Sequence, residues 1–192
     1  MLTVTVRDRD TLYIASPLDL APGLDEGEAL CEDNLSVWLA SEGEGCYLTC
    51  GCPNSFFADL LRYHPLGLTG KVTLESMISQ VLPATRALCE EYGQICGEDE
   101  DELLTDFTLA KEEAAFRVTS HMEVEELAED AAYGRRDKAA TAALLENGTL
   151  PPLERIRAAF TAAALDDPSI SYFPVVAVNV KTGKRVLLRD KP

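Results

Sequence analysis

The sequence carries little positive charge and has no long apolar run near its start. Of its 192 residues, 17 are Lys or Arg and 33 are Asp or Glu, which gives a formal net charge of −16. This charge repels phosphate backbones and anionic lipid head groups, so nucleic acid and membrane surfaces are not expected as partners. Charged residues at positions 7–10 interrupt the first twenty residues, which therefore predict neither a signal peptide nor a membrane span. We expect a cytoplasmic protein.

The sequence also lacks recognisable motifs for phosphate or zinc. The glycine pairs in segments 43–45 and 67–70 lack the strand–loop–helix context and the lysine of a phosphate-binding loop. The two histidines, His64 and His121, are far apart in the sequence. The chain has six cysteines, which we expect to be reduced thiols because the sequence shows no export signal. We expect no bound cofactor.

Three of the cysteines are clustered at even spacing. Cys46, Cys50 and Cys52 would project from one face of a strand, because side chains alternate along a strand with period two. A zinc site normally has four ligands and a Cys-x2-Cys spacing, which this cluster does not have. We therefore interpret these thiols as small apolar side chains. A cysteine-based metal or redox module is the alternative.

The remaining sequence alternates between strand-like and helix-like patterns. Apolar residues at every second position predict strands at 3–7, 11–16, 35–39, 45–51, 107–109, 115–120, 122–127, 175–180 and 185–188. Apolar residues at every third or fourth position predict helices at 56–63, 74–92, 137–145 and 153–165. The chain thus runs through strands, two helices, strands, two helices and strands.

The second predicted helix is the longest. Thr73 is placed to cap its start, and Pro83 is expected to kink it. The helix has apolar residues at helical spacing, which predicts that they form one buried face: Leu74, Ile78, Val81, Leu82, Leu88 and Tyr92.

The order of the elements predicts the fold class. Consecutive strands joined by short turns form antiparallel sheets, and helices that arrive in pairs form layers outside them. We therefore predict an α+β fold, a four-layer α-β-β-α sandwich. With 46% hydrophobic residues the chain is long enough to bury one large core, so we expect a single domain over residues 1–192.

This order resembles that of the proteasome β-subunit and HslV family of N-terminal-nucleophile (Ntn) hydrolases. The local matches are the opening hairpin, with Val4–Arg7 and Tyr13–Ser16, and Ala132–Arg135 before an alanine-rich helix. The resemblance implies a threonine peptidase whose first residue supplies both the attacking hydroxyl and, through its α-amine, the base. Here that position holds Met1, the family's lysine would fall near residues 33–34, and its serine would fall at Arg135. The resemblance therefore implies the fold of a peptidase subunit without its catalytic residues.

An active enzyme is the alternative. Removal of Met1 and Leu2 would leave Thr3 as the first residue, on the same face of its strand. The segment Asp166, Asp167 and Ser169 resembles the acid and the serine that flank the family's threonine. In this reading Thr3, Asp166, Asp167 and Ser169 are the catalytic residues of a threonine peptidase or amidohydrolase. The alternative role for the two aspartates is to cap a helix end or turn.

The resemblance also implies how such a protein would act without catalysis. Subunits of this fold pack against each other through their helical layers, so we expect self-association, with other protein subunits as further partners. The alanine-rich faces at 139–145 and 158–164 are candidate contact surfaces. Packing of these faces onto the chain's own sheet explains them equally well.

Overall fold

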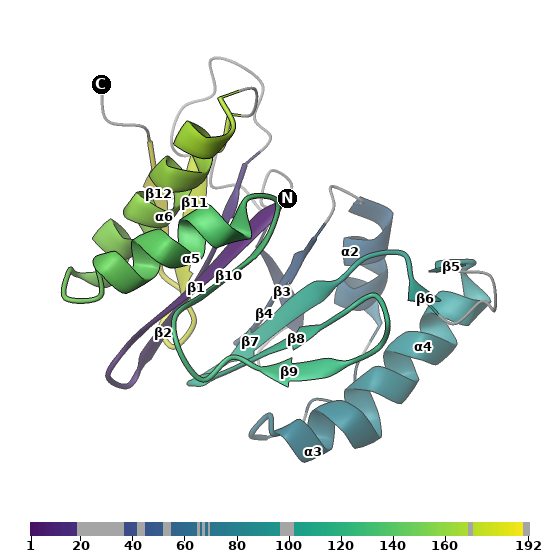
Figure 1. The fold of residues 1–192 in the computed structure, drawn as a ribbon. Helices are drawn as coiled ribbons and strands as arrows, with labels where there is room; N and C mark the ends of the chain where they lie inside the picture. The colour runs from purple at the N-terminus through teal and green to yellow at the C-terminus, as the bar shows by residue number, and fades with distance from the viewer. Residues whose placement is uncertain are drawn as a thin grey trace.

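Two antiparallel sheets lie face to face, and helices cover the outer side of each (Figure 1). The computed structural model describes residues 1–18, 37–41, 45–51, 55–64, 66, 68, 70–96, 102–168 and 171–189. Within these residues the layers are helices, sheet, sheet and helices, so the predicted α-β-β-α sandwich is confirmed.

Sheet A contains the two ends of the chain. It is five-stranded, with the order β10-β1-β2-β11-β12. Its strands are β1 (Leu2–Asp8), β2 (Thr11–Pro17), β10 (Ala131–Gly134), β11 (Val175–Asn179) and β12 (Arg185–Leu188). Four of these were predicted from the sequence. The prediction missed β10, whose four residues are too few to show an alternating pattern.

Sheet B is formed by the middle of the chain. It is also five-stranded, with the order β3-β4-β7-β8-β9. Its strands are β3 (Trp38–Ser41), β4 (Cys46–Cys50), β7 (Phe107–Lys111), β8 (Ala114–Val118) and β9 (Val124–Glu126). A separate two-stranded sheet, which the sequence did not predict, pairs β5 (Ile95–Cys96) with β6 (Glu102–Leu103).

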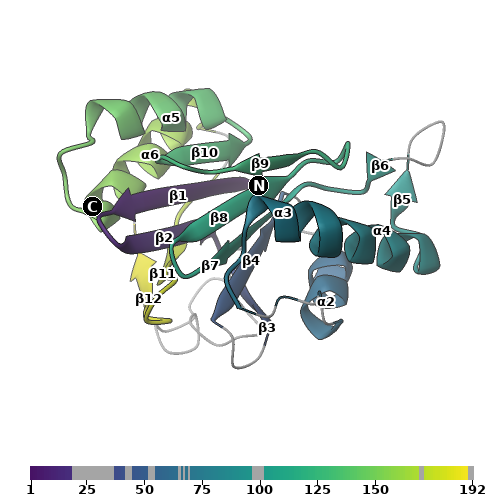
Figure 2. The ribbon, with the colours of Figure 1, turned by 90° about the horizontal axis from the view of Figure 1, so that it is seen from below.

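The helices form two outer layers. Helices α5 (Asp137–Glu146) and α6 (Pro152–Asp166) pack on each other and on sheet A. Helix α2 (Ser55–Tyr63) and the long helix formed by α3 (Leu74–Ser76), a π-helical turn η2 (Met77–Val81) and α4 (Leu82–Glu91) cover sheet B (Figure 2). All four predicted helices are present. None of the described helices is long and apolar enough to cross a membrane.

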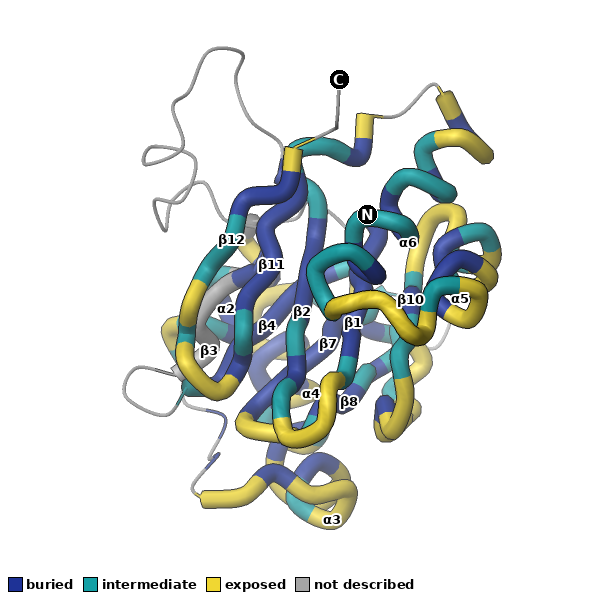
Figure 3. The backbone as a smooth tube through the Cα atoms, turned by 90° about the vertical axis from the view of Figure 1, so that its left-hand side faces the viewer, coloured by how far each residue is buried: buried dark blue, intermediate teal, exposed yellow. Residues whose placement is uncertain are grey.

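Three apolar layers hold the sandwich together, and Figure 3 shows most of the strands as buried. Strand β1 illustrates how: Leu2, Val4 and Val6 face α5 and α6, whereas Thr3 and Thr5 face the other sheet. The layer between the sheets and the layer between sheet B and its helices are formed in the same way. Burial of these apolar side chains is the main favourable term in folding.

The predicted buried face of the long helix is wrong in part. Thr73 caps the helix as predicted, in a reciprocal pair of hydrogen bonds with Ser76. However, Leu74, Ile78 and Tyr92 are exposed. The π-helical turn adds a residue to the repeat, so the stretch before it is rotated relative to the stretch after it. Tyr92 follows the last helical residue and therefore does not continue the buried stripe.

Candidate functional site

The candidate site lies between the two sheets, near the start of β1. In sheet A, Thr3 of β1 pairs with Tyr133 of β10. In sheet B, Thr49 of β4 pairs with Thr108 of β7, which in turn pairs with Arg117 of β8. The register of the strands therefore aligns polar side chains from both sheets at one level of the space between them.

These side chains surround a cavity of about 100 Å³. It is lined by Met1, Thr3, Thr49, Gly51, Asp106, Phe107, Thr108, Arg117, Tyr133, Gly134 and Arg135. The threonines are almost completely buried, with exposed fractions of 4% for Thr3, 0% for Thr49 and 3% for Thr108. The hydroxyls of Thr3 and Thr49 lie 2.6 Å apart and form a hydrogen bond. The cavity is therefore polar and small.

Arg117 is the main charged group of this cavity. Its Nη2 donates to Asp106 Oδ2 at 2.7 Å, and its Nη1 lies 3.7 Å from Glu125 Oε2. The guanidinium carbon also lies 4.5 Å from the centre of the Tyr133 ring, a cation–π contact. Two carboxylates and an aromatic ring therefore hold Arg117 in place and offset its charge.

Tyr133 keeps its proton over the physiological pH range. Burial, followed by the negative charge of Glu125, raises the pKa of the Tyr133 phenol to about 12. The positive charge of Arg117 acts in the opposite direction and is the smaller effect. A phenol with this pKa does not act as a general base near neutral pH.

Backbone contacts fix the start of β1 at the edge of the cavity. The Met1 amine donates to the carbonyl oxygen of Gly51 at 2.7 Å, and the backbone N–H of Arg135 donates to the Met1 carbonyl at 3.2 Å. Gly134 has φ of +107°, and a Cβ at this position would lie 2.1 Å from the Met1 carbonyl oxygen. Only glycine allows β10 and the start of β1 to approach this closely.

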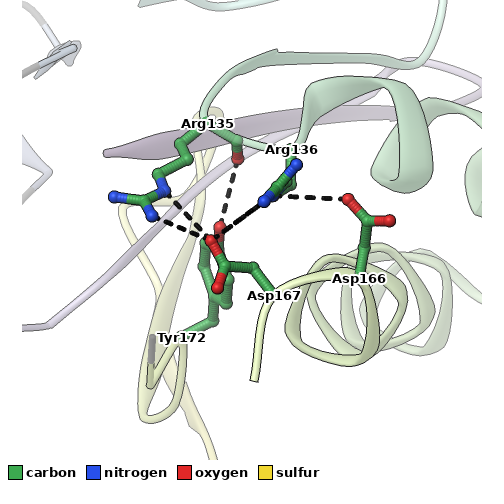
Figure 4. A network of polar contacts seen from close by, with 5 residues as sticks. All are labelled: Arg135, Arg136, Asp166, Asp167 and Tyr172. Carbon is green, nitrogen blue, oxygen red and sulfur yellow. Dashed lines mark hydrogen bonds and ion pairs between the residues drawn. The ribbon is translucent and has the colours of Figure 1, made fainter. Parts of the chain in front are cut away.

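A cluster of ion pairs supports the cavity from the side of the helices (Figure 4). Arg135 and Arg136 both donate to Asp167 Oδ2, from Nη2 at 2.8 Å and 3.3 Å respectively. Arg136 also lies 3.4 Å from Asp166, and the Tyr172 hydroxyl donates to the Arg135 carbonyl at 3.3 Å. The cluster ties the start of α5 to the end of α6.

The structure brings together only part of the predicted site. Thr3 lines the cavity, but Asp166 and Asp167 do not line it. At the end of α6, Asp166 pairs with Arg136 and Asp167 pairs with Arg135, both from the segment just before α5. Arg135, which lines the cavity, also donates to Asp167, and Ser169 lies outside the described residues.

The clustered cysteines lie in a different part of the molecule. Cys46 and Cys50 are fully buried on the side of β4 that packs against Phe57 and the other apolar residues of α2 and α4. Both lie in one apolar cluster on the same face of β4, which agrees with the predicted even spacing, whereas Cys52 lies outside the described residues. In the part of the chain that the structure describes, no three His, Cys, Asp or Glu side chains are grouped to hold a metal ion.

Sequence reasoning missed most of the cavity. Thr49, Thr108, Asp106 and Arg117 come from three separate segments, and only the strand register places them together. One signal was present, because the predicted first strand alternates valines with Thr3 and other polar residues. The two faces of this strand were therefore expected to lie in different environments, one apolar and one polar.

Comparison with known proteins supports the fold at the level of structure. No family model matches the sequence, and no curated protein matches it. Two solved structures of Thiobacillus denitrificans BPH, one alone and one in complex with epoxomicin, match with TM-scores of 0.66 and 0.65 at 19% identity, over 100% of both chains. Eukaryotic HslV from Trypanosoma brucei matches with a TM-score of 0.59 at 14% identity, over 93% of this chain and 99% of that one.

The match to these structures agrees with the order of elements along the chain and with the antiparallel pairing in both sheets. Identities of this size establish a shared fold and leave activity open. The chain therefore has the α-β-β-α fold of the HslV- and proteasome-like Ntn hydrolases.

Proposed function

We propose that this chain is a proteasome/HslV-like protein without peptidase activity, which acts by associating with copies of itself. The surroundings of Thr3 carry the proposal. Its hydroxyl belongs to a nearly buried side chain and forms a hydrogen bond with the hydroxyl of Thr49, which is a weak proton acceptor. A hydroxyl nucleophile needs an adjacent base, and with Met1 and Leu2 in place the backbone nitrogen of Thr3 is an amide, not the free α-amine that would serve as that base.

The other groups around the cavity are poorly placed to serve as that base. The Asp106 carboxylate accepts from Arg117 at 2.7 Å, so this ion pair occupies the carboxylate at the cavity. Tyr133 retains its proton because its pKa is about 12. The arginines that line the cavity, Arg117 and Arg135, carry only donor groups and no acceptor atom in their side chains. This composition supports a non-catalytic cavity.

Trimming to Thr3 would carry a cost in stability. Leu2 is fully buried against α5 and α6, so its removal would lose about 1.5–3 kcal/mol of burial free energy. It would also remove the bonds that Met1 makes with Gly51 and Arg135. We therefore place the threonine peptidase second to the non-catalytic protein.

The outer helical layers offer surfaces for self-association. Ala140, Ala143, Ala159 and Ala163 are buried within the molecule, so these members of the alanine-rich faces at 139–145 and 158–164 are not free for contacts between subunits. The same layer instead exposes large apolar side chains, above all Leu145 and Leu165, each 77% exposed. The two leucines lie near opposite ends of the α5–α6 pair, so they are two separate candidate contact points on this layer.

Light scattering on the purified protein tests the self-association. We expect a mass that is a multiple of 20.9 kDa, and a return to 20.9 kDa in the double variant Leu145→Lys with Leu165→Lys. Both positions lie in the last turn of a helix, where a lysine suits the helix dipole, so folding should be preserved. Gln80→Lys, at an exposed position of the other helical layer, is the matched control.

Peptide hydrolysis and intact mass test the lack of activity. We expect no turnover of fluorogenic peptides and a mass that includes Met1 and Leu2. Turnover that Thr3→Val abolishes, by a protein whose mass lacks the first two residues, would show instead that the threonine peptidase is correct. A wild-type protein that stays at 20.9 kDa at every concentration would refute the assembly.

A further inference from the structure

A row of polar side chains crosses sheet B at the cavity between the two sheets. Thr49, Thr108 and Arg117 are register partners on the adjacent strands β4, β7 and β8, so their side chains lie on one face of the sheet. Thr3 meets this row from sheet A through its hydrogen bond with Thr49. All four residues line the cavity of about 100 Å³. The two sheets therefore bring hydroxyl and guanidinium groups to one small space.

The hydroxyls of Thr3 and Thr49 carry one proton more than they use. Each hydroxyl has a proton, but the two groups share a single hydrogen bond of 2.6 Å. One of the two O–H groups therefore has no acceptor in the described part of the chain. Both side chains are almost completely buried, and a buried donor without an acceptor costs free energy. An acceptor atom placed in the cavity would remove this cost.

Arg117 brings a second unused donor to the cavity. Its Nη2 donates to Asp106 and its Nη1 lies beside Glu125. Its Nε is buried and has no hydrogen-bond partner among the described residues. A guanidinium has only N–H donors, in a fixed planar arrangement that matches the two oxygens of a carboxylate. The cavity thus lacks acceptors for donors on both of its walls.

Positive groups predominate at this cavity. The Met1 ammonium, Arg117 and Arg135 line it, together with the carboxylate of Asp106. The positive groups already have partners in the protein; Arg135, for example, donates to Asp167 (Figure 4). These carboxylates offset part of the positive charge, and the whole chain has a net charge of −16. A ligand with one negative charge is therefore favoured over a ligand with two.

The volume of the cavity limits the ligand to a few atoms. A cavity of about 150 Å³ can hold benzene, so one of about 100 Å³ suits a molecule of about four or five non-hydrogen atoms. Water also fits such a space. However, a water molecule brings two further donors, whereas a carboxylate brings acceptors alone. A small carboxylate therefore matches the unused donors better than water does.

We propose that this cavity binds a small monocarboxylate such as acetate. Its oxygens would accept from the Arg117 Nε and from the unused O–H of the Thr3–Thr49 pair, with the Thr108 hydroxyl beside them. The proposal goes beyond self-association, and it rests on the proposed function in one respect, since Met1 and Leu2 must remain in place. It assigns a ligand to a cavity whose groups do not support hydrolysis.

Calorimetric titration of the full chain at constant ionic strength tests the proposal. We expect acetate to bind with a Kd of about 1 mM or tighter. Acetamide has nearly the same shape, but it lacks the charge and replaces one acceptor with a donor, so it should bind at least about tenfold more weakly. Sulfate, with its second negative charge, should also bind at least about tenfold more weakly. No binding of acetate, or equal binding of acetamide or sulfate, would overturn the proposal.

Two substitutions locate the site. Arg117→Lys keeps a positive charge beside Asp106 but removes the Nε–H and the planar guanidinium, and should weaken acetate binding at least about tenfold. The double variant Thr3→Val with Thr49→Val removes both partners of a hydrogen bond at similar shape, so it should fold and should weaken acetate binding to a similar extent. Arg86→Lys, at an exposed position of α4, is the matched control and should leave the affinity unchanged. Unchanged acetate affinity in either cavity variant would show that acetate binds elsewhere.

The intact mass of the same sample separates this proposal from the proposed function. A chain that retains Met1 and Leu2, hydrolyses no peptide and does not bind acetate would refute the ligand alone. Acetate binding by such a chain supports the ligand at any oligomeric state. A chain that lacks both residues and hydrolyses peptides would refute the proposed function and the acetate site with it, because the site requires these residues in place.

Discussion

Gly134→Ala tests most directly how β1 is held at the candidate site. The added Cβ would lie 2.1 Å from the Met1 carbonyl oxygen and 3.2 Å from its carbonyl carbon, and both atoms belong to the backbone. The chain must therefore separate β10 from the start of β1, because no side-chain rotation relieves the contact. The bond from the Arg135 N–H to Met1 would be lost at the same time.

The expected cost has two parts. Alanine at a φ of +107° costs about 1–3 kcal/mol in backbone strain. Loss of the strand contact and its hydrogen bond adds about 1–2 kcal/mol. We therefore expect the free energy of unfolding to fall by about 3 kcal/mol, which in a chain of this length lowers Tm by roughly 6–12 °C.

Alanine variants of two further glycines, measured by urea unfolding, separate the cost of backbone strain from the cost of the lost strand contact. At Gly93, φ is +64° and a Cβ would meet no atom within 4 Å, so Gly93→Ala measures the cost of a left-handed backbone without a steric contact. At Gly148 a Cβ would make ordinary contacts at 3.7 Å and 3.8 Å, so Gly148→Ala should be close to neutral. The reasoning is refuted if Gly134→Ala destabilises the protein no more than Gly93→Ala does.

Two other predictions concern buried charge and alkaline pH. Asp130→Ala leaves the buried guanidinium of Arg155 without its 2.5 Å partner and should lower the free energy of unfolding by about 3–5 kcal/mol. Glu90→Ala breaks an exposed pair with Arg86 and should cost under about 1 kcal/mol. Similar costs for the two variants in chemical unfolding would contradict this reasoning. Burial, followed by the charge of Glu90, raises the pKa of the Cys89 thiol from 9.0 to about 11, so the folded state disfavours the thiolate. The contribution of the Cys89 thiol to the free energy of unfolding is complete below pH 9.0 and is lost as the pH rises towards about 11, at up to about 1.4 kcal/mol per pH unit. Cys89→Ala should therefore flatten the dependence of the unfolding free energy on pH in this window.

The sequence was sufficient for the architecture because the architecture depends on local patterns. Alternation predicted the long strands, and the alanine-rich helices followed from their spacing. The register of sheet B, in contrast, does not follow from local patterns. Thr108 and Arg117 become neighbours only when β7 and β8 pair in one particular register, and no local pattern specifies this pairing with β4.

The site residues that the resemblance implied lie in different surroundings in the structure. Thr3 lies at the cavity because its position in the first strand is fixed by alternation. Asp167 does not line the cavity, and its carboxylate accepts from two arginines at the start of α5. The sequence showed Arg135 and Arg136, but their partner became evident only from the packing of α5 against α6.

The π-helical turn at Met77–Val81 contains one residue more than the same turn of an α-helix would. Deletion of one residue within the turn would restore regular α-helical spacing and rotate the preceding stretch by about 100° about the helix axis, without moving the anchored half that contains Leu88. Leu74, which is now exposed, would then point in a new direction. The same rotation would carry the buried Met77 away from the apolar layer on sheet B, so the extra residue of the turn is what keeps both halves of the helix packed on the sheet.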